Sequence, residues 1–98
     1  MAAYVIADIE VTEPIEYEDY KKQAAPTAAL YDGKYIVRGG AVEVAEGEWT
    51  PHRFVVVEFP TMAQAKAWYC SPEYTPAKEI RHRTAKSSVI FVEGTKPA

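Results

Sequence analysis

Two carboxylates interrupt segments that otherwise read as apolar strands. Asp8 lies within residues 3–9 and Glu58 lies within residues 52–59. If both side chains face a closed cavity, burial would raise the pKa of each carboxyl and suit it to general acid–base catalysis. The alternatives are an ion pair with Arg38 or exposure to solvent at a strand end. Asp8 and Glu58 are therefore the candidate catalytic residues.

Arg38 stands directly before Gly39 and Gly40. Paired glycines within a strand-like segment are typical of a β-bulge or of a close backbone approach, and bulges often redirect side chains near active sites. A guanidinium at such a point can hold a substrate carboxylate by two hydrogen bonds. The alternative is a structural pair with Asp8 or Glu58.

Four further residues are candidate substrate-binding groups: Tyr4, His52, Tyr69 and Tyr74. Tyr4 shares the strand face of the first carboxylate, and His52 could act as a base near neutral pH at a cavity rim. Trp68, Tyr69 and Tyr74 gather where two helical segments meet, a spacing more typical of a core than of a binding site. A tyrosine hydroxyl at a cavity mouth is the functional alternative.

No metal site and no cofactor site is predicted. His52 and His82 have neither HxH nor HExxH spacing, and Cys70 is the single cysteine. We expect Cys70 to be a buried, inert thiol. Glycine-rich phosphate-binding patterns are absent from the sequence.

A basic stretch follows the last aromatic cluster. It comprises Lys78, Arg81, His82, Arg83 and Lys86. A solvated helix face is the interpretation that we favour. The alternative is attraction to an anionic ligand or to the acidic first helix of a partner.

Composition places the chain in a broad class. It has 98 residues, of which 48% are hydrophobic and 26% charged, so one folded domain over residues 1–98 is expected. The net charge of −3 argues against nucleic acid as a partner. No apolar run approaches the length of a membrane span, and no secretory signal is visible, so we expect a cytoplasmic protein.

Hydrophobic periodicity predicts a β-α-β-β-α-β order. Pro14 is suited to a first helical turn, Pro26 predicts a break, and Gly33 is expected in the left-handed conformation after the helix. Thr61 and Gln64 have the spacing of a capping box. The predicted strands cover 3–9, 34–44, 52–59 and 87–93, and the helical segments cover 14–25, 27–31, 61–70 and 72–85.

This order predicts a ferredoxin-like α+β sandwich: a four-stranded antiparallel sheet with helices on one face, and with the first and last strands in the middle. Strand alternation predicts one face covered by helices, with Val5, Ala7, Ile9, Val55, Val57 and Phe59. The other face then carries Tyr4, Ile6, Asp8, Phe54, Val56 and Glu58. Because that face is partly apolar, we expect two copies to pack sheet to sheet and enclose a cavity in each.

Several segments together resemble an uncharacterised family, domain of unknown function 1330. They are Lys34-Tyr35-Ile36-Val37-Arg38-Gly39-Gly40, Arg53 with Glu58-Phe59-Pro60, Ala67-Trp68-Tyr69, Ser71-Pro72-Glu73-Tyr74 and Ile80-Arg81. The resemblance implies a homodimeric α+β barrel and supplies no reaction. The wider fold group includes cofactor-free monooxygenases, lactone isomerases, dehalogenating or decarboxylating enzymes and haem-handling proteins.

Two functional hypotheses follow. The first is a cofactor-independent isomerase, lyase or monooxygenase-like enzyme for a small organic acid or aromatic metabolite, with Asp8 or Glu58 as base and Arg38 as anion clamp. The second is a non-catalytic ligand-binding or interaction module. In that case the polar groups only orient a ligand or seal the dimer.

Overall fold

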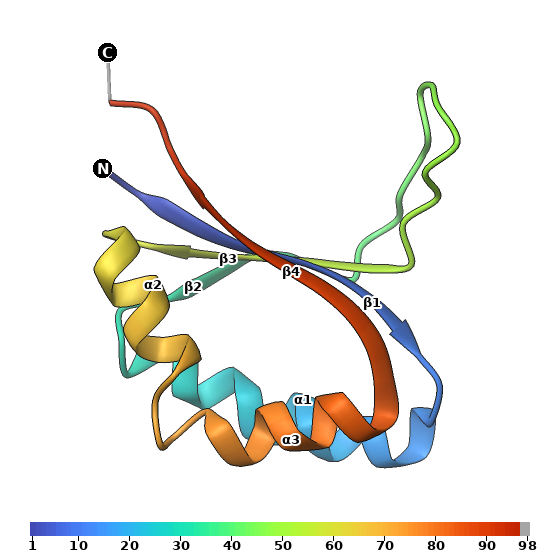
Figure 1. Cartoon of the computed structure of the whole chain (residues 1–98), viewed down its shortest axis with the longest axis horizontal. Coiled ribbons are helices and arrows are strands. Elements are labelled where there is room, and N and C mark those ends of the chain that lie inside the picture. Colours follow the sequence, from blue (N-terminus) through green and yellow to red (C-terminus); the bar gives the residue numbers. More distant parts are fainter. Residues whose placement is uncertain (97–98) are drawn as a thin grey trace.

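The computed structural model describes residues 1–96 and has the predicted ferredoxin-like α+β architecture (Figure 1). A four-stranded antiparallel sheet has its helices on one side. The elements are β1 (Ala3–Val11), α1 (Pro14–Ala29), β2 (Lys34–Arg38), β3 (Arg53–Phe59), α2 (Met62–Tyr69), α3 (Thr75–Thr84) and β4 (Ala85–Glu93). No helix in this part of the chain is long and apolar enough to cross a membrane.

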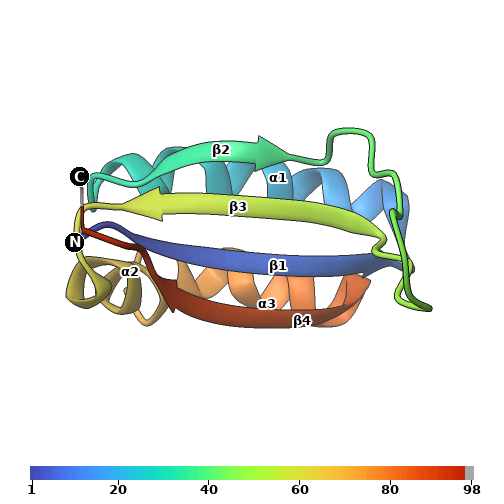
Figure 2. The same ribbon diagram turned by 90° about the horizontal axis from the view of Figure 1, so that it is seen from above.

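The sheet order is β2-β3-β1-β4, which Figure 2 shows from above. The prediction that the first and last strands are central is wrong, because β4 lies at an edge and β3 is central with β1. Each helical crossover passes over one intervening strand: β3 lies between β1 and β2, and β1 lies between β3 and β4. The long β1–β3 register, from Ala3 opposite Phe59 to Ile9 opposite Arg53, fills the centre of the sheet.

The helix-facing side of the sheet is as predicted. Ile9 and Phe59 are among the most buried side chains, and the α1 and α2 residues Ala24, Ala28 and Ala65 pack into the same core. The six predicted inward strand residues, Val5, Ala7, Ile9, Val55, Val57 and Phe59, all belong to this core. Burial of this apolar surface is the main driving force for the fold.

α1 runs from Pro14 to Ala29 without the predicted break at Pro26. Pro26 and Lys22, one turn earlier, are both exposed. The lost hydrogen bond therefore falls on the solvent side of the helix, where water can satisfy the free carbonyl. After the helix, Asp32 rather than Gly33 has a positive φ, of 63°. Gly33 is instead needed for space, since a Cβ atom there would overlap the Phe59 ring.

β2 ends at Arg38, earlier than the predicted strand 34–44. The irregularity in its pairing lies between Tyr35 and Val37, not at the two glycines. Residues 39–51, which we call the arm, leave the sheet and rise on the side away from the helices (Figure 1). Gly39, with φ of 71°, begins this departure.

The second half of the chain contains the predicted cap. The Gln64 backbone N–H donates to Thr61 Oγ1 at 3.1 Å at the start of α2. α3 begins at Thr75 rather than at residue 72, because Ser71 caps a separate turn by accepting from the Tyr74 N–H at 3.1 Å. α3 then passes directly into β4 at Ala85.

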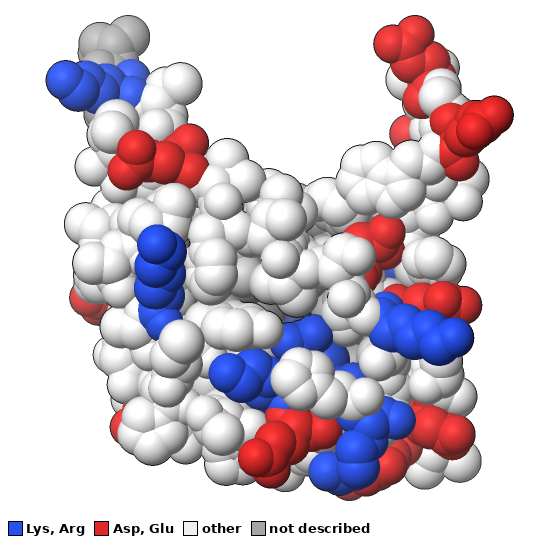
Figure 3. All heavy atoms as spheres, viewed as in Figure 1, with Lys and Arg blue, Asp and Glu red and all other residues white. Residues whose placement is uncertain are grey.

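The face of the sheet away from the helices is uncovered. Ile6 pairs across the sheet with Val56 on β3 and Ile90 on β4, so its centre is an apolar band. The arm and the segment that follows β4 rise on either side of this band (Figure 1), and Figure 3 shows a hollow between the two projections. We call this surface the open face.

Candidate functional site

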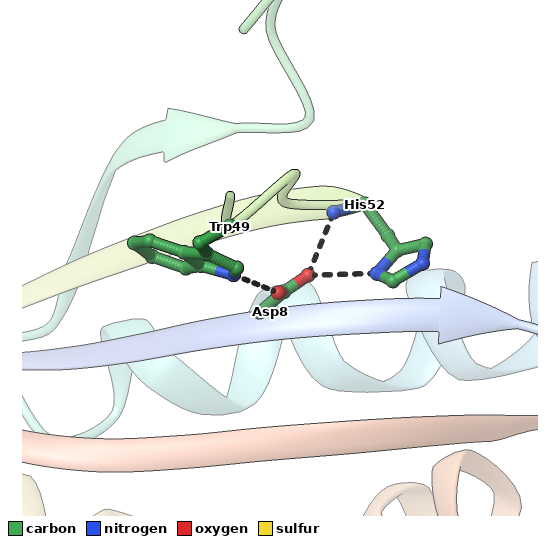
Figure 4. A network of polar contacts seen from close by, with 3 residues as sticks. All are labelled: Asp8, Trp49 and His52. Atoms are coloured by element: carbon green, nitrogen blue, oxygen red, sulfur yellow. Dashed lines mark hydrogen bonds and ion pairs between the residues drawn. The ribbon is translucent and has the colours of Figure 1, made fainter. Parts of the chain in front are cut away.

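Asp8 lies on the open face and is the centre of a polar network (Figure 4). The Trp49 indole N–H donates to Asp8 Oδ2 at 3.0 Å. The His52 backbone N–H donates to Asp8 Oδ1 at 2.8 Å, and His52 Nδ1 lies 3.4 Å from the same oxygen. The Trp49 ring also packs edge-on against Phe54, with ring centres 6.0 Å apart. These contacts join the end of the arm to β1.

The pKa of Asp8 is lowered, in contrast to the rise that burial in a closed cavity would cause. The main cause is the hydrogen bond from the His52 backbone N–H, with further lowering by the Trp49 and His52 side chains. Hydrogen bonds to a carboxylate favour its charged form, and here they outweigh burial of a side chain that is 16% exposed. Asp8 is thus an ionised hydrogen-bond acceptor in this network.

Glu58 lies on the same face but far from Asp8. Glu58 pairs with Tyr4, and Asp8 pairs with Phe54. The two carboxylates are therefore four positions apart along the register, which is about 13 Å. Hydrogen bonding to Glu58 raises the pKa of Tyr4, so these two predicted residues are neighbours. Asp8 with His52 and Glu58 with Tyr4 therefore form two separate groups.

Arg38 lies on the opposite side of the sheet from both carboxylates. It pairs with Val55, which faces the helices, and its guanidinium carbon lies 4.8 Å from the centre of the Tyr35 ring. No ion pair joins Arg38 to Asp8 or Glu58 in the part of the chain that the structure describes. The interpretation of Arg38 as their structural partner is therefore wrong.

A cavity lies on the helix side, between the sheet and the helices. Its volume is about 20 Å³, room for one water-sized group. Its apolar wall comes from β1, β3 and β4, and its polar groups come from the helices and β2. Those polar groups are Tyr20, Tyr35, Tyr69, Tyr74 and Arg81. We call it the tyrosine cavity.

Arg81 is the charged group of the tyrosine cavity and is only 3% exposed. Its Nη2 donates to the Tyr69 hydroxyl at 3.3 Å, and Tyr74 also interacts with the guanidinium. No ion pair of Arg81 is found within residues 1–96. Since buried charges in proteins are usually paired, a buried guanidinium that meets only phenols is unusual.

Tyr20 and Tyr35 are the tyrosines of this cavity whose pKa burial raises. The Tyr20 and Tyr74 hydroxyls lie 2.9 Å apart. Burial raises the pKa of Tyr35 to about 12 and raises the pKa of Tyr20 further. At neutral pH these hydroxyls keep their protons and can donate hydrogen bonds to an anion.

Of the predicted binding residues, Tyr69 and Tyr74 line this cavity. Tyr74 is almost fully buried, while Tyr69 is half-buried and packs edge-on against Phe91. Arg81 was missed, because its basic neighbours pointed to a solvated helix face. A signal existed, since Arg81 falls at helical spacing from Tyr74, Ala77 and Thr84, all of which are buried.

The described residues contain no group of three or more His, Cys, Asp or Glu side chains suited to a metal ion. Cys70, expected to be buried, is exposed at the end of α2. Its position as the residue that ends the helix turns the side chain out of the core.

The fold and its uncovered sheet face define a ferredoxin-like α+β protein. The chain belongs to the family named domain of unknown function 1330, whose model matches residues 2–95. No curated protein matches the sequence.

Solved structures share this fold at low sequence identity. A protein of unknown function from Rhodopseudomonas palustris has a TM-score of 0.77 at 17% identity, covering 98% of this chain and 84% of that chain. A dimeric ferredoxin-like protein of unknown function from Jannaschia has a TM-score of 0.74 at 13% identity, with coverages of 96% and 100%. SnoaB, a cofactor-independent oxygenase from Streptomyces nogalater, has a TM-score of 0.61 at 13% identity, with coverages of 98% and 94%.

Proposed function

We propose that this protein binds a small organic acid or aromatic metabolite, as its anion, in the tyrosine cavity. The observation that carries the proposal is Arg81: a buried guanidinium that contacts tyrosine hydroxyls and has no carboxylate partner in residues 1–96. Burying a charge without a counterion is costly, and a bound anion would supply that counterion.

The cavity walls favour an aromatic or otherwise flat ligand. Trp68 and Tyr74 stack with ring centres 4.1 Å apart, and Tyr69 lies beside both. The opposite wall is aliphatic, from Val5, Val55 and neighbouring strand residues. Because the cavity holds only a water-sized group, a larger ligand has to displace a side chain at its edge, and half-buried Tyr69 is the residue placed to move.

As an enzyme, the protein would work as a cofactor-independent isomerase, lyase or oxygenase. Arg81 and the tyrosine hydroxyls would stabilise negative charge on an enolate- or phenolate-like substrate in a site with little water. This is the chemistry that a fixed cation and protonated phenols can supply. SnoaB, which shares the fold, is a cofactor-independent oxygenase.

Neither predicted base, Asp8 or Glu58, lines the tyrosine cavity. We propose Glu58 or Asp8 as a proton acceptor only in a different site, on the open face, that a second copy of the chain completes. The lining of the tyrosine cavity contains no carboxylate and no imidazole. This observation favours the second candidate function, binding without catalysis.

We also propose that the protein is a homodimer formed through the open face. Two facts support this: the apolar band contains Ile90, which is 54% exposed, and half-buried Ile6, and proteins of the same fold from Jannaschia and Bacteroides fragilis are dimeric.

The test of the ligand proposal is a binding screen of aromatic and aliphatic carboxylates, followed by fluorescence of buried Trp68 and by calorimetry. Hits should bind Arg81→Gln at least about tenfold more weakly, since a hydrogen bond to a charged group is lost. Tyr69→Phe, which removes one oxygen and keeps the ring, should weaken binding by a smaller factor.

The matched control is Arg83→Gln, which removes the same charge from the same helix at an exposed ion pair with Glu16. It should bind hits like the wild type. Equal affinity of wild type, Arg81→Gln and Tyr69→Phe for every hit would refute the proposal.

A further inference from the structure

We propose that a second pocket, between α1 and the β2–β3 edge of the sheet, is a carboxylate-binding site formed by Arg38, Arg53 and Tyr17. The pocket adjoins the tyrosine cavity and shares Tyr20 and Tyr35 with it. It goes beyond the function proposed above, because none of its charged groups contacts Arg81.

The charged residues that line this pocket are all cations: Lys21, Arg38 and Arg53. Lys21 is neutralised by Glu18 on the same helix, at 3.1 Å. Neither Arg38 nor Arg53 has an ion pair within residues 1–96. Two guanidinium groups on adjacent strands therefore bring uncompensated positive charge to one pocket.

Two buried polar atoms of the pocket lack a hydrogen-bond partner among the described residues. They are the Tyr17 hydroxyl and Arg53 Nε. Tyr17 is only 2% exposed, and burial raises its pKa more than the nearby Arg53 guanidinium lowers it, so the hydroxyl keeps a proton that it can donate. Buried donors in proteins are rarely unpaired, and an acceptor group in this pocket would satisfy both.

The guanidinium groups are positioned before any ligand arrives. Arg38 packs over the Tyr35 ring, and the Arg53 guanidinium carbon lies 5.9 Å from the centre of the Tyr17 ring. The Arg53 guanidinium also lies against Gly39, where a Cβ atom would overlap its Nη1 atom. Such packing reduces the side-chain entropy lost when a ligand binds.

The guanidinium donors of the pocket suit a flat carboxylate. The volume of the pocket is about 20 Å³, so only a water-sized part of a ligand enters it. A guanidinium binds a carboxylate through two parallel N–H donors. The pocket would thus hold the acid group of a ligand while the rest of the molecule extends outward.

The test follows the arginine side-chain Nε–H signals by NMR during titration with benzoate, and separately with inorganic phosphate, at constant ionic strength. In the wild type, the Arg53 Nε–H signal should shift in a saturable way with benzoate and respond more weakly to phosphate. Arg38→Gln should weaken the benzoate affinity read from this signal by about tenfold. Tyr17→Phe, which removes one hydroxyl donor and keeps the ring, should weaken it severalfold.

Arg83→Gln controls for the loss of one charge and should leave the titration unchanged. Arg81→Gln should also leave the Arg53 response intact, so a failure of the tyrosine cavity to bind ligand would not be mistaken for a failure of this pocket. The proposal is overturned if the Arg53 signal does not respond, if Arg38→Gln and Tyr17→Phe titrate like the wild type, or if phosphate binds more tightly than benzoate.

Discussion

Asp8 joins β1 to the end of the arm by hydrogen bonds. Its two oxygens accept from Trp49 and from the His52 backbone, which belong to the last residues of the arm and the entry to β3. A carboxylate held in this way is suited to anchor a loop. Its role is then to fix the arm beside the open face.

We predict that Asp8→Asn lowers the free energy of unfolding at pH 7 by about 1.5 kcal/mol, the lower end of the net values for a hydrogen bond to a charged group. The amide can replace only one of the two acceptor oxygens. Urea unfolding should measure this loss, and Trp49 fluorescence should report that the indole becomes more mobile. A variant as stable as the wild type, with unchanged Trp49 fluorescence, would show that Asp8 does not anchor the arm.

The stabilisation from Asp8 should also depend on pH. Because the pKa of the folded carboxyl lies below its ordinary value of about 3.9, the unfolded chain binds this proton at higher pH than the folded chain. The contribution is therefore complete above about pH 4 to 5 and disappears as pH falls through the folded pKa. Unfolding measured from pH 2 to pH 6 should show a smaller slope in Asp8→Asn than in Asp19→Asn, which changes an exposed carboxylate of α1.

At the residue scale, strand alternation located the carboxylates but not their partners. The alternating pattern placed Asp8, Glu58 and Tyr4 on the open face, where they lie. It could not predict that Trp49 folds back onto Asp8, because the path of the arm is not periodic. Arg81 was not identified for another reason. On α3 the run of basic residues overlaps the stripe of buried residues, and the basic run alone is typical of a solvated face.

The end of β2 depends on a single backbone conformation. Gly39 has φ of 71°, and its N–H donates to the Phe54 carbonyl at 2.8 Å just before the arm departs. The Arg53 guanidinium occupies the space where a side chain would begin. This position requires glycine both for its conformation and for its closeness to Arg53.

We predict that Gly39→Ala lowers the free energy of unfolding by about 1–2 kcal/mol, from left-handed strain alone, with a further loss from displacement of Arg53. The matched control is Gly40→Ala, since a Cβ atom at Gly40 meets nothing within 4 Å. That variant should stay within about 0.5 kcal/mol of the wild type. Chemical denaturation measures both, and equal effects at the two glycines would contradict the assigned role of Gly39.

At the element scale, the sequence predicted the kinds of elements well and their ends less well. Val42 and Val44 continue the alternation of β2, so the pattern alone extends that strand to residue 44. In the structure no strand is available to pair with them, because β3 begins only at Arg53. Periodicity indicates what a segment can form, whereas pairing decides where it stops.

For the whole molecule, the decisive feature is the open face. Ile90 is 54% exposed at its centre, and Ile6 and Val56 lie beside it in the register. We predict that Ile90→Lys converts the proposed dimer to a monomer, because it would bury a charge in an apolar contact. Analytical ultracentrifugation should show the mass falling from about twice 10.9 kDa to 10.9 kDa.

Leu30→Lys is the matched control. Leu30 is 67% exposed at the end of α1, on the helix side, so its substitution should leave the mass unchanged. A wild-type protein that sediments as a monomer at micromolar concentration would remove the basis for the dimer. So would an Ile90→Lys variant of unchanged mass.

For the whole molecule, the order of the strands in the sheet is what the sequence predicted wrongly. The order of elements along the sequence is compatible with more than one arrangement of strands, and the strand patterns of β3 and β4 are both rich in valine. What separates them is packing: β3 has three consecutive buried valines, Val55, Val56 and Val57, at its centre, whereas β4 has exposed residues at alternate positions from Lys86 to Val92. That difference marks β4 as an edge strand only once burial is known.

The charge of the arm has a colloidal consequence. Its exposed Val42, Val44 and Trp49 are interspersed with Glu43, Glu46 and Glu48. Unpaired, β-prone valines beside an uncovered apolar sheet are a common route to aggregation, and like charges within such a segment oppose it. As pH falls toward the isoelectric point of 5.3, the net charge of the chain approaches zero and the repulsion between molecules weakens. The glutamates of the arm therefore oppose aggregation through its exposed valines and the neighbouring open face.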